Sequence, residues 1–570
     1  MQINTEVKRT YLPELLQINS WEDIAGFFEE LADRNIKNAD DLRQWFRDRS
    51  ELEAFISEDA GWRYIRMTCD TANEEYQNAY SYFISEIEPK IAPFSNKLNK
   101  KALESPFLDD LRQKEGYGIM IREMEKDVQI FREENIRLKS EAANLSKEYG
   151  NITGAMTVEI DGHELTLQQA AVILESKNRE KRKEAYEKIQ KRRLQDKDKL
   201  NELYTKLIHL RHQMAKNAGF DNYRDYMFTA MGRFDYEPQD CFDFHTSVKE
   251  EIVPLLNNFA EERKQKLQLD SLRPYDKAVD PSGKDPLKPF SSTDELTEKS
   301  IEVFSKIDPF LGECLTTMRN IKHLDLGSRK GKAPGGYNYP LSEIGVPFIF
   351  MNATSTLRDM VTLMHEGGHA VHSIITKDLE LTDFKHTPSE VAELASMSME
   401  LISMDQWHLF FEDEESLKRA KKAHLEQVID TLPWVALIDK FQHWIYEHPD
   451  HNEEDRYDAW GRIFDDFTDD VTDWSGLEAY RANTWQKQLH LYEVPFYYIE
   501  YGFAQLGAIA VWKNYKENGG KGLEGYLNAL KLGYTRSIPE IYEAANIKFD
   551  FSRSYIKELI EFVKSELNKI

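Results

Sequence analysis

The chain has 570 residues, of which 31% are charged, and its formal net charge is −26. This acidic balance disfavours nucleic acid as a partner, because nucleic-acid binding needs a basic footprint. No stretch approaches about 18 consecutive apolar residues, so the sequence predicts neither a membrane span nor a membrane partner.

Cysteine usage and the start of the chain suggest a cellular compartment. Three cysteines, Cys69, Cys241 and Cys314, lie far apart and form no CxxC pair. Such a sparse set predicts neither a disulfide framework nor a thiolate metal site, and it favours a reducing, cytoplasmic location. The first residues do not combine a basic region with an apolar one, so no signal peptide is expected. No oligomeric state is predicted.

The first part of the chain has helical patterns. Residues 15–150 repeat amphipathic spacings, of which Trp21, Ile24 and Phe28 are an example. The run Lys126–Glu148, rich in Glu, Lys, Arg and Leu, predicts one long exposed helix.

A hairpin signal and a linker signal then divide the chain. Alternating residues around Asp161-Gly162 predict a β-hairpin over residues 156–167, because Asp-Gly favours a tight turn. Residues 267–292 hold several Pro, Asp and Gly residues, which is typical of a linker. We therefore expect two lobes, which interleave and have an approximate boundary: residues 1–290 as an N-terminal helical lobe, and residues 291–570 as a second lobe.

A short apolar strand is predicted over Val346–Asn352, between turn signals. Pro347 near its start favours an edge strand, because proline cannot donate to a sheet ladder. An extended peptide could add to such an edge through main-chain hydrogen bonds. A plain core strand is the alternative.

The sequence His365-Glu366-Gly367-Gly368-His369 reads HExxH and lies in a segment of helical periodicity. Thr356 and Asp359 form a helix-start signal upstream. On a helix, His365 and His369 lie on one face and can bind a single Zn²⁺, while Glu366 can reach a water on that ion. The two glycines cost about 1 kcal/mol each against alanine, which predicts a close approach of either substrate or a neighbouring helix.

A second helix supplies the predicted third ligand. Thr387 as N-cap, Pro388 at the first helical position and Glu390 folding back form a capping-box pattern. Because capping would occupy Glu390, Glu393 one turn further on is the predicted ligand. Glu400 could orient a histidine ligand through its free ring N–H.

Three other histidines are interpreted as loop residues. His443, His448 and His451 cluster around Pro449-Asp450, after a predicted helix. Polar residues around a proline are typical of a loop. We therefore expect these three histidines to lie in a solvated loop.

The combination of HExxH with a later glutamate resembles the glutamate-zincin peptidases. His372 extends the motif to HExGHxxH, which resembles the thimet oligopeptidase and oligoendopeptidase F family, and the chain length favours the bacterial oligoendopeptidase F side. The resemblance implies a mostly α-helical, two-lobed ellipsoid with a deep central channel and a small β-sheet near the active site. It also implies one Zn²⁺ per chain, and a supporting position near the ligands for His372 as well as for Glu400.

Two further stretches carry the same resemblance. Lys332–Tyr337 is similar to the family's glycine–tyrosine loop, which implies substrate-binding positions at Gly336 and Tyr337 and, on the following strand, at Phe350. The segment 490–502 is similar to a tyrosine-rich stretch that closes over the substrate carbonyl. On this chain the residues that match best are His490, Tyr498 and Tyr501, whose N–H and O–H groups can donate to an oxyanion.

The function predicted is a zinc-dependent endopeptidase whose catalytic lobe is residues 291–570, with His365, His369 and Glu393 as ligands and Glu366 as the base. The resemblance implies that the substrates are short, unstructured oligopeptides. A zinc carboxypeptidase or dipeptidyl carboxypeptidase on a related helical fold is one alternative. A non-catalytic peptide-binding zinc protein is another, but a structural site has no use for a base beside an open coordination position.

Overall fold

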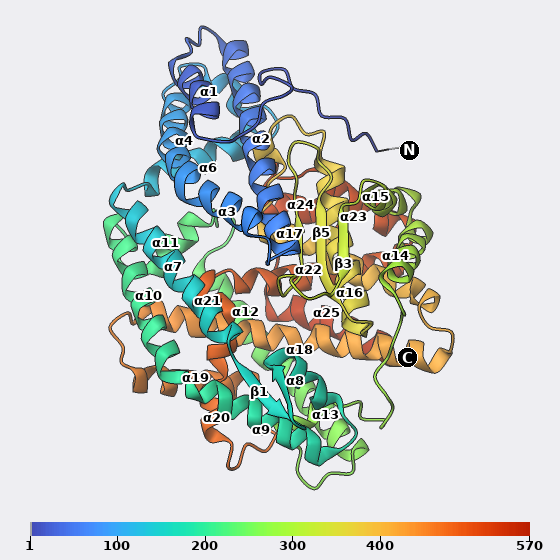
Figure 1. The fold of residues 1–570 in the computed structure, drawn as a ribbon. Coiled ribbons are helices and arrows are strands. Elements are labelled where there is room, and N and C mark those ends of the chain that lie inside the picture. The colour runs from blue at the N-terminus through green and yellow to red at the C-terminus, as the bar shows by residue number, and fades with distance from the viewer. Residues whose placement is uncertain (1–2) are drawn as a thin grey trace. The chain divides into compact units, whose positions relative to one another are not determined.

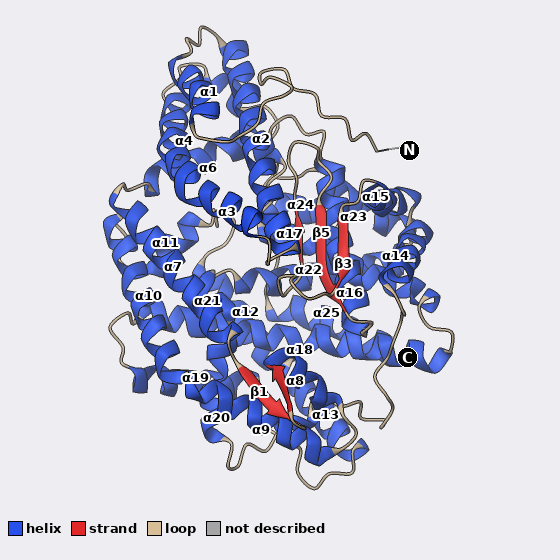
Figure 2. Ribbon diagram, viewed as in Figure 1, coloured by secondary structure: helices blue, strands red, loops and turns tan. Residues whose placement is uncertain are grey.

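Helices make up most of the chain, and the strands form two small sheets (Figure 2). The computed structural model describes residues 3–570. The predicted mostly α-helical class is therefore confirmed. Among the described residues, no helix is both long enough and apolar enough to cross a bilayer.

The chain forms two compact units, each built from three separate segments. Unit 1 consists of Met1–Gln129, Leu287–Lys422 and Ala504–Phe549, and unit 2 of Ile130–Pro286, Ala423–Phe503 and Asp550–Ile570. The chain passes from unit 2 to unit 1 within the linker predicted at residues 267–292.

Unit 1 contains the first helices, the larger sheet and the helices that follow it (Figure 1). Three helices, α6, α18 and α22, each lie partly in unit 1 and partly in unit 2. The elements are α1 Glu22–Asp33, α2 Ala39–Cys69, α3 Glu74–Tyr82, the π-helix Phe83–Ile87, α4 Glu88–Leu103, α5 Leu108–Arg112, α6 Tyr117–Ile130, α14 Thr293–Ile307, α15 Pro309–Asn320, β3 Leu324–Gly327, β4 Tyr337–Tyr339, β5 Phe348–Ala353, α16 Leu357–Thr376, the 3₁₀ turn Thr382–Phe384, α17 Ser389–Ser403, the 3₁₀ turn Met404–Leu409, α18 Glu414–Glu447, α22 Tyr498–Asn518, α23 Gly520–Lys531 and α24 Ile538–Ala544.

The amphipathic spacing at the start of the chain builds an apolar core in unit 1. Ile24 and Phe28 are buried in α1, where they pack with Trp45 of α2. Trp45 also donates its indole N–H to the carbonyl of Leu31, at 2.8 Å, so its polar atom is satisfied inside the core.

The larger sheet has the strand order β3-β5-β4, with β3 parallel and β4 antiparallel to β5. The predicted edge strand is therefore wrong, because β5 is the central strand. Pro347 lies immediately before the first residue of β5, so its missing N–H costs no ladder bond. On its antiparallel side, β5 pairs with β4, which is an edge strand of the sheet.

Unit 2 contains the small hairpin and the remaining helices. They are α7 Glu134–Gly154, β1 Thr157–Ile160, β2 His163–Thr166, α8 Leu167–Val172, the 3₁₀ turn Ile173–Glu175, α9 Arg179–Gln195, α10 Lys197–Asn217, α11 Tyr223–Ala230, α12 Pro238–Glu251, α13 Val253–Lys266, the 3₁₀ turn Pro274–Asp276, α19 Glu453–Phe467, α20 Glu478–Ala482, the 3₁₀ turn Thr484–Lys487, α21 Leu489–Glu493 and α25 Arg553–Leu567.

The predicted hairpin is confirmed: β1 and β2 pair antiparallel, and Asp161 and Gly162 form the turn with φ of 53° and 76°. The single helix predicted over 126–148 is wrong, because the chain breaks between α6 and α7. At the break, Arg132 donates to the carbonyls of Asn217 and Ala218, at 3.1 and 3.3 Å, where α10 ends. These bonds satisfy carbonyls that a helix end leaves without partners.

Candidate active site

Helix α16 begins where the sequence predicts. The Thr356 hydroxyl accepts from the main-chain N–H of Asp359, at 3.2 Å, and the Asp359 carboxylate accepts from the N–H of Thr356, at 2.9 Å. This reciprocal capping box fixes the first turn of the helix. Further along this helix, His365 and His369 are four residues apart and share one face, with their ring centroids 4.9 Å apart.

Glu393 of α17 meets both histidines of α16. Its Oε2 lies 3.3 Å from His365 Nε2 and 3.7 Å from His369 Nε2, and one ligand atom from each of the three side chains lies within 4.8 Å of the others. Zinc ligands at about 2.0–2.1 Å in tetrahedral geometry stand roughly 3.4 Å apart. The three side chains therefore fit one zinc ion.

The neighbours of the ligand group fix its orientation. His365 Nδ1 donates to Oε1 of Glu400, at 2.6 Å, which leaves Nε2 to face Glu393. The hydroxyl of Ser396 donates to Oε2 of Glu393, at 3.1 Å. Ser396 was not predicted, although its position three residues after Glu393 places both on one helical face.

The predicted capping box before α17 is wrong. The helix begins at Ser389, with Pro388 in the N-cap position and no side-chain cap hydrogen bond. Glu390 is buried, and its carbonyl accepts from the hydroxyl of Tyr542 at 3.1 Å. Glu393 faces the two histidines, but the capping argument that preferred it over Glu390 does not hold.

The two glycines of the motif leave room for neighbouring helices to pack closely against α16. A Cβ on Gly368 would lie 2.6 Å from Cα of Ser396, and a Cβ on Gly367 would lie 2.6 Å from the ring of Phe304 in α14. Real Cβ contacts are not this short. Of the two predicted explanations, a packed neighbouring helix accounts for both glycines.

Glu366 is 8% exposed, and burial raises the pKa of its carboxyl to about 7; His365 opposes this increase, whereas Glu393 and Glu400 add to it. A base with a pKa near neutrality is suited to proton transfer at physiological pH. Asn338 of β4 donates its amide N–H to the main-chain carbonyl of Glu366, at 3.1 Å. This contact, which was not predicted, joins the edge strand β4 to helix α16 at Glu366.

The ligand group is electrostatically coupled. Burial opposes charge on His365, but hydrogen bonds to Glu393 and Glu400 raise its pKa well above the usual value. Burial lowers the pKa of His369 to about 4. Burial also opposes charge on Glu393, yet the two histidines and Ser396 lower its pKa to about 2. Glu393 is thus held as a carboxylate, the form that binds a cation.

The loop predicted to bind substrate is held by a buried lysine. The ammonium of Lys332 donates to the carbonyls of Asp325, Gly327 and Met351, and to Oδ1 of Asp325 at 2.9 Å. Phe350 is fully buried, and its ring stacks on that of Tyr337 at 4.7 Å. The Phe350 side chain is therefore part of the core beneath β4.

Three other residues of the predicted site also lie in unit 1: Gly336, Tyr337 and His372. A Cβ on Gly336 would lie 3.3 Å from the carbonyl of Phe350, so this glycine runs close along β5. The hydroxyl of Tyr337 bonds to that of Thr68, at 2.6 Å. His372 is 5% exposed, and burial lowers its pKa to about 3, so it is a neutral core residue of α16.

The three predicted oxyanion donors lie together in unit 2. The ring of His490 is 4.8 Å from that of Tyr498 and 5.8 Å from that of Tyr501, and the two tyrosine rings are 5.4 Å apart. Nδ1 of His490 lies 2.8 Å from the amide nitrogen of Gln488. The metal-ligand group belongs to unit 1.

Comparison with known proteins identifies the family. The profile of peptidase family M3 matches residues 172–560, and that of the peptidase M3 N-terminal domain matches residues 16–131. The chain belongs to peptidase family M3. The enzyme prediction is thereby confirmed over the non-catalytic zinc protein, and so is the predicted resemblance to oligoendopeptidase F.

Three relatives illustrate how far the similarity to this M3 peptidase extends. An oligoendopeptidase F homolog of Borreliella burgdorferi is 25% identical and covers 82% of this chain and 78% of its own length. The structure of PZ peptidase A with an inhibitor has a TM-score of 0.90 at 27% identity, covering 96% of this chain and 97% of that one. A putative oligoendopeptidase F structure has a TM-score of 0.90 at 28% identity, with 98% of each chain covered.

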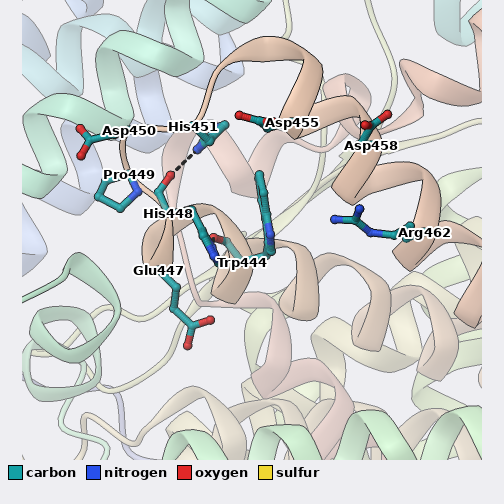
Figure 3. Close-up of a pocket in the computed structure, with 9 residues that line it drawn as sticks. All are labelled: Trp444, Glu447, His448, Pro449, Asp450, His451, Asp455, Asp458 and Arg462. Atoms are coloured by element: carbon teal, nitrogen blue, oxygen red, sulfur yellow. Dashed lines mark hydrogen bonds between the residues drawn. The ribbon is translucent and has the colours of Figure 1, made fainter.

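A separate hollow of about 570 Å³ lies in unit 2 of this M3 peptidase, and none of the predicted site residues line it (Figure 3). The ring N–H of His451 donates to the carbonyl of His448 there, at 2.6 Å. The lining residues come from the end of α18, the following turn and α19: Trp444, Glu447, His448, Pro449, Asp450, His451, Asp455, Asp458 and Arg462. Of the three histidines predicted in a solvated loop, His448 is exposed, whereas His443 is buried within α18.

Proposed function

We propose that this protein is a zinc-dependent endopeptidase that hydrolyses internal bonds of short, unstructured oligopeptides. The observation that carries the proposal is the meeting of His365 and His369 with Glu393, beside a buried Glu366 on the same helix. Family membership supports peptide substrates, and the names of the relatives support cleavage of internal bonds.

The residues of the proposed site have separate chemical roles. When bound by His365, His369 and Glu393, Zn²⁺ supplies Lewis acidity that polarises a carbonyl and acidifies water. Glu366 accepts the proton of the attacking water at its carboxylate and passes it to the leaving amine. Glu400 holds the ring of His365, so that the lone pair of Nε2 stays on the metal side.

The roles of the aromatic group in unit 2 remain proposals that rest on the sequence pattern. We propose that His490, Tyr498 and Tyr501 donate hydrogen bonds to the oxyanion that forms from the scissile carbonyl. Their mutual proximity supports a joint role.

A cytoplasmic location is supported by the three cysteines, none of which forms a disulfide in residues 3–570.

Replacing Glu366 tests the mechanism. In Glu366→Gln the amide cannot accept the water proton, so kcat should fall by about 10²- to 10⁴-fold while zinc content stays unchanged. The measurements are steady-state cleavage of an internally quenched peptide and metal content per chain. Undiminished kcat with normal metal content would rule out Glu366 as the base.

The endopeptidase assignment is tested against the carboxypeptidase alternative with blocked substrates. A carboxypeptidase must bind the free C-terminal carboxylate, usually through a cation. We expect a peptide amidated at its C-terminus to be cut internally at the rate of the free acid, as read by mass spectrometry. Loss of cleavage on amidation would favour the carboxypeptidase.

A further inference from the structure

A second group of potential metal ligands lies in unit 2, between α12 and α18 (labelled in Figure 1). Cys241 and His245 are four residues apart on α12, and Asp439 and His443 are four residues apart on α18. Residues at this spacing share one helical face, so each helix turns a pair of side chains toward the other. Ligand atoms of Cys241, Asp439 and His443 lie within 4.8 Å of one another.

The contacts inside the group centre on Asp439. Its Oδ2 lies 2.8 Å from Nε2 of His245 and 3.3 Å from Nε2 of His443. Within the described part of the chain, Nδ1 of His443 has no hydrogen bond and Nε2 has only the 3.3 Å contact with Asp439, although the residue is only 1% exposed. Asp439 Oδ1 likewise has no hydrogen bond to any described residue. A buried polar atom without a partner is costly, and an ion would provide one.

Aromatic rings surround His443, and the charges nearby favour a cation. The rings of Phe242, Phe496 and Phe228 lie 4.8, 5.4 and 6.0 Å from that of His443. Asp439 is the acidic side chain of the group, and a ring nitrogen of each histidine lies within 3.3 Å of its Oδ2. The adjacent Lys440 is paired with Asp466, at 3.0 Å.

We propose that Cys241, Asp439 and His443 bind a second Zn²⁺, which joins α12 to α18, while His245 donates to Asp439 and holds its carboxylate in place. Thiolate, imidazole and carboxylate form a donor set that zinc accepts. Cys241 binds as a thiolate and its proton passes to solvent. The thiolate and the carboxylate together balance the charge of the ion, so no net charge is buried.

The site is separate from the proposed active site and serves the fold. Its ligands all belong to unit 2, and about 200 residues of sequence separate the two helices. The cysteine spacing predicted no thiolate site, because a motif search detects only ligands that are close in sequence. The prediction that placed His443 in a solvated loop obscured the same group.

Metal content in a variant without the active-site ligands tests the proposal. The purified full-length wild type should carry about two zinc ions per chain after dialysis against a weak chelator, and His365→Ala/His369→Ala about one. Adding Cys241→Ser to that double variant should remove the remaining ion. The matched control is Cys314→Ser, since Cys314 is equally buried but belongs to α15 and to neither ligand group of the described residues.

Cobalt gives a second readout, because the wild type itself reports whether a thiolate binds the metal. Co²⁺ bound to a thiolate absorbs in the near ultraviolet through charge transfer, whereas a site of two histidines and a glutamate has no sulfur to do so. Cobalt-loaded wild type and Cys314→Ser should show the band, and Cys241→Ser should lose it. A wild type with one ion per chain, no metal in the double variant, or no thiolate band would overturn the proposal.

Discussion

At the scale of single residues, His365 is held from both sides. One ring nitrogen donates to Glu400 and the other faces Glu393, so the orientation of the ring is fixed. Ser396 holds the Glu393 carboxylate in the same way. The proposed metal-binding set therefore consists of three ligands and two side chains that orient them.

Replacing Glu400 should weaken zinc binding without removing a ligand. In Glu400→Gln the hydrogen bond to His365 loses its charge, and we expect zinc affinity to fall by about 10- to 100-fold. Competition with a chromogenic chelator measures this change.

The chain offers a matched control for this replacement. Glu390 is buried in the same helix, and its carboxylate is outside the ligand group. Glu390→Gln should therefore leave zinc affinity at the wild-type level. Equal effects of the two variants would mean that Glu400 acts on the fold of α17 and not on His365.

At the scale of elements, α16 and α17 approach each other through Gly368. Main-chain atoms of Ala395 and Ser396 occupy the space that a Cβ on Gly368 would need. The separation of the two helices is therefore set by backbone contact. Because α16 carries the histidines and α17 carries Glu393, this contact also sets the distance between the ligands.

Adding one methyl group at this contact should disturb both stability and metal binding. In Gly368→Ala the helices must move apart, which we expect to cost about 1–3 kcal/mol of unfolding free energy and to weaken zinc binding. Chemical denaturation and zinc competition measure the two effects.

Gly461 is the control for the helix propensity of alanine. It lies inside α19, where an added Cβ would meet nothing within 4 Å. Gly461→Ala should stabilise the protein by about 0.5–1 kcal/mol, the usual gain over glycine in a helix. If Gly368→Ala were stabilising as well, close packing of α16 on α17 would not explain the glycine.

Local patterns predicted those parts of this site that depend on neighbouring residues. The Thr356–Asp359 box and the i,i+4 histidines are local, and both are present in α16. The Asp161-Gly162 turn is local too. The residues from Thr387 match the pattern of a capping box, but tertiary packing and not this pattern determines how α17 begins, so that prediction was wrong.

Long-range contacts could not be predicted from spacing. The position of β5 at the centre of its sheet depends on β3 and β4, which the local pattern of Val346–Asn352 does not contain. The link from Asn338 to Glu366 and the contacts of Lys332 join residues whose proximity depends on how the sheet folds. The burial of His443 likewise depends on Phe242 and His245 of α12, far away in sequence.

At the scale of the whole molecule, neither unit is a continuous piece of chain. Each unit needs segments from both sides of the linker at residues 267–292. The apolar core around Trp45 and Phe28 draws nearly all its members from the first 124 residues, together with Leu381 and Phe384. A cut at the linker would divide both units.

Expression of the two halves tests this interleaving. Fragment 291–570 contains every proposed zinc ligand of the active site, but we expect it to unfold without a cooperative transition and to lack peptidase activity. Co-expression with fragment 1–290 should restore both, as read by thermal unfolding and peptide cleavage. An active, cooperatively folded fragment 291–570 would show that the second half is an independent domain.

The backbone contact at Gly368 has a consequence for how the enzyme acquires its metal. Because packing and not the ion holds α16 against α17, the ordering of the three ligands is completed during folding. A protein that lacks only the active-site ion should therefore remain folded, unlike a zinc finger, and should exchange that ion reversibly. Cells could then hold a pool of inactive peptidase that zinc supply converts to the active form without new synthesis.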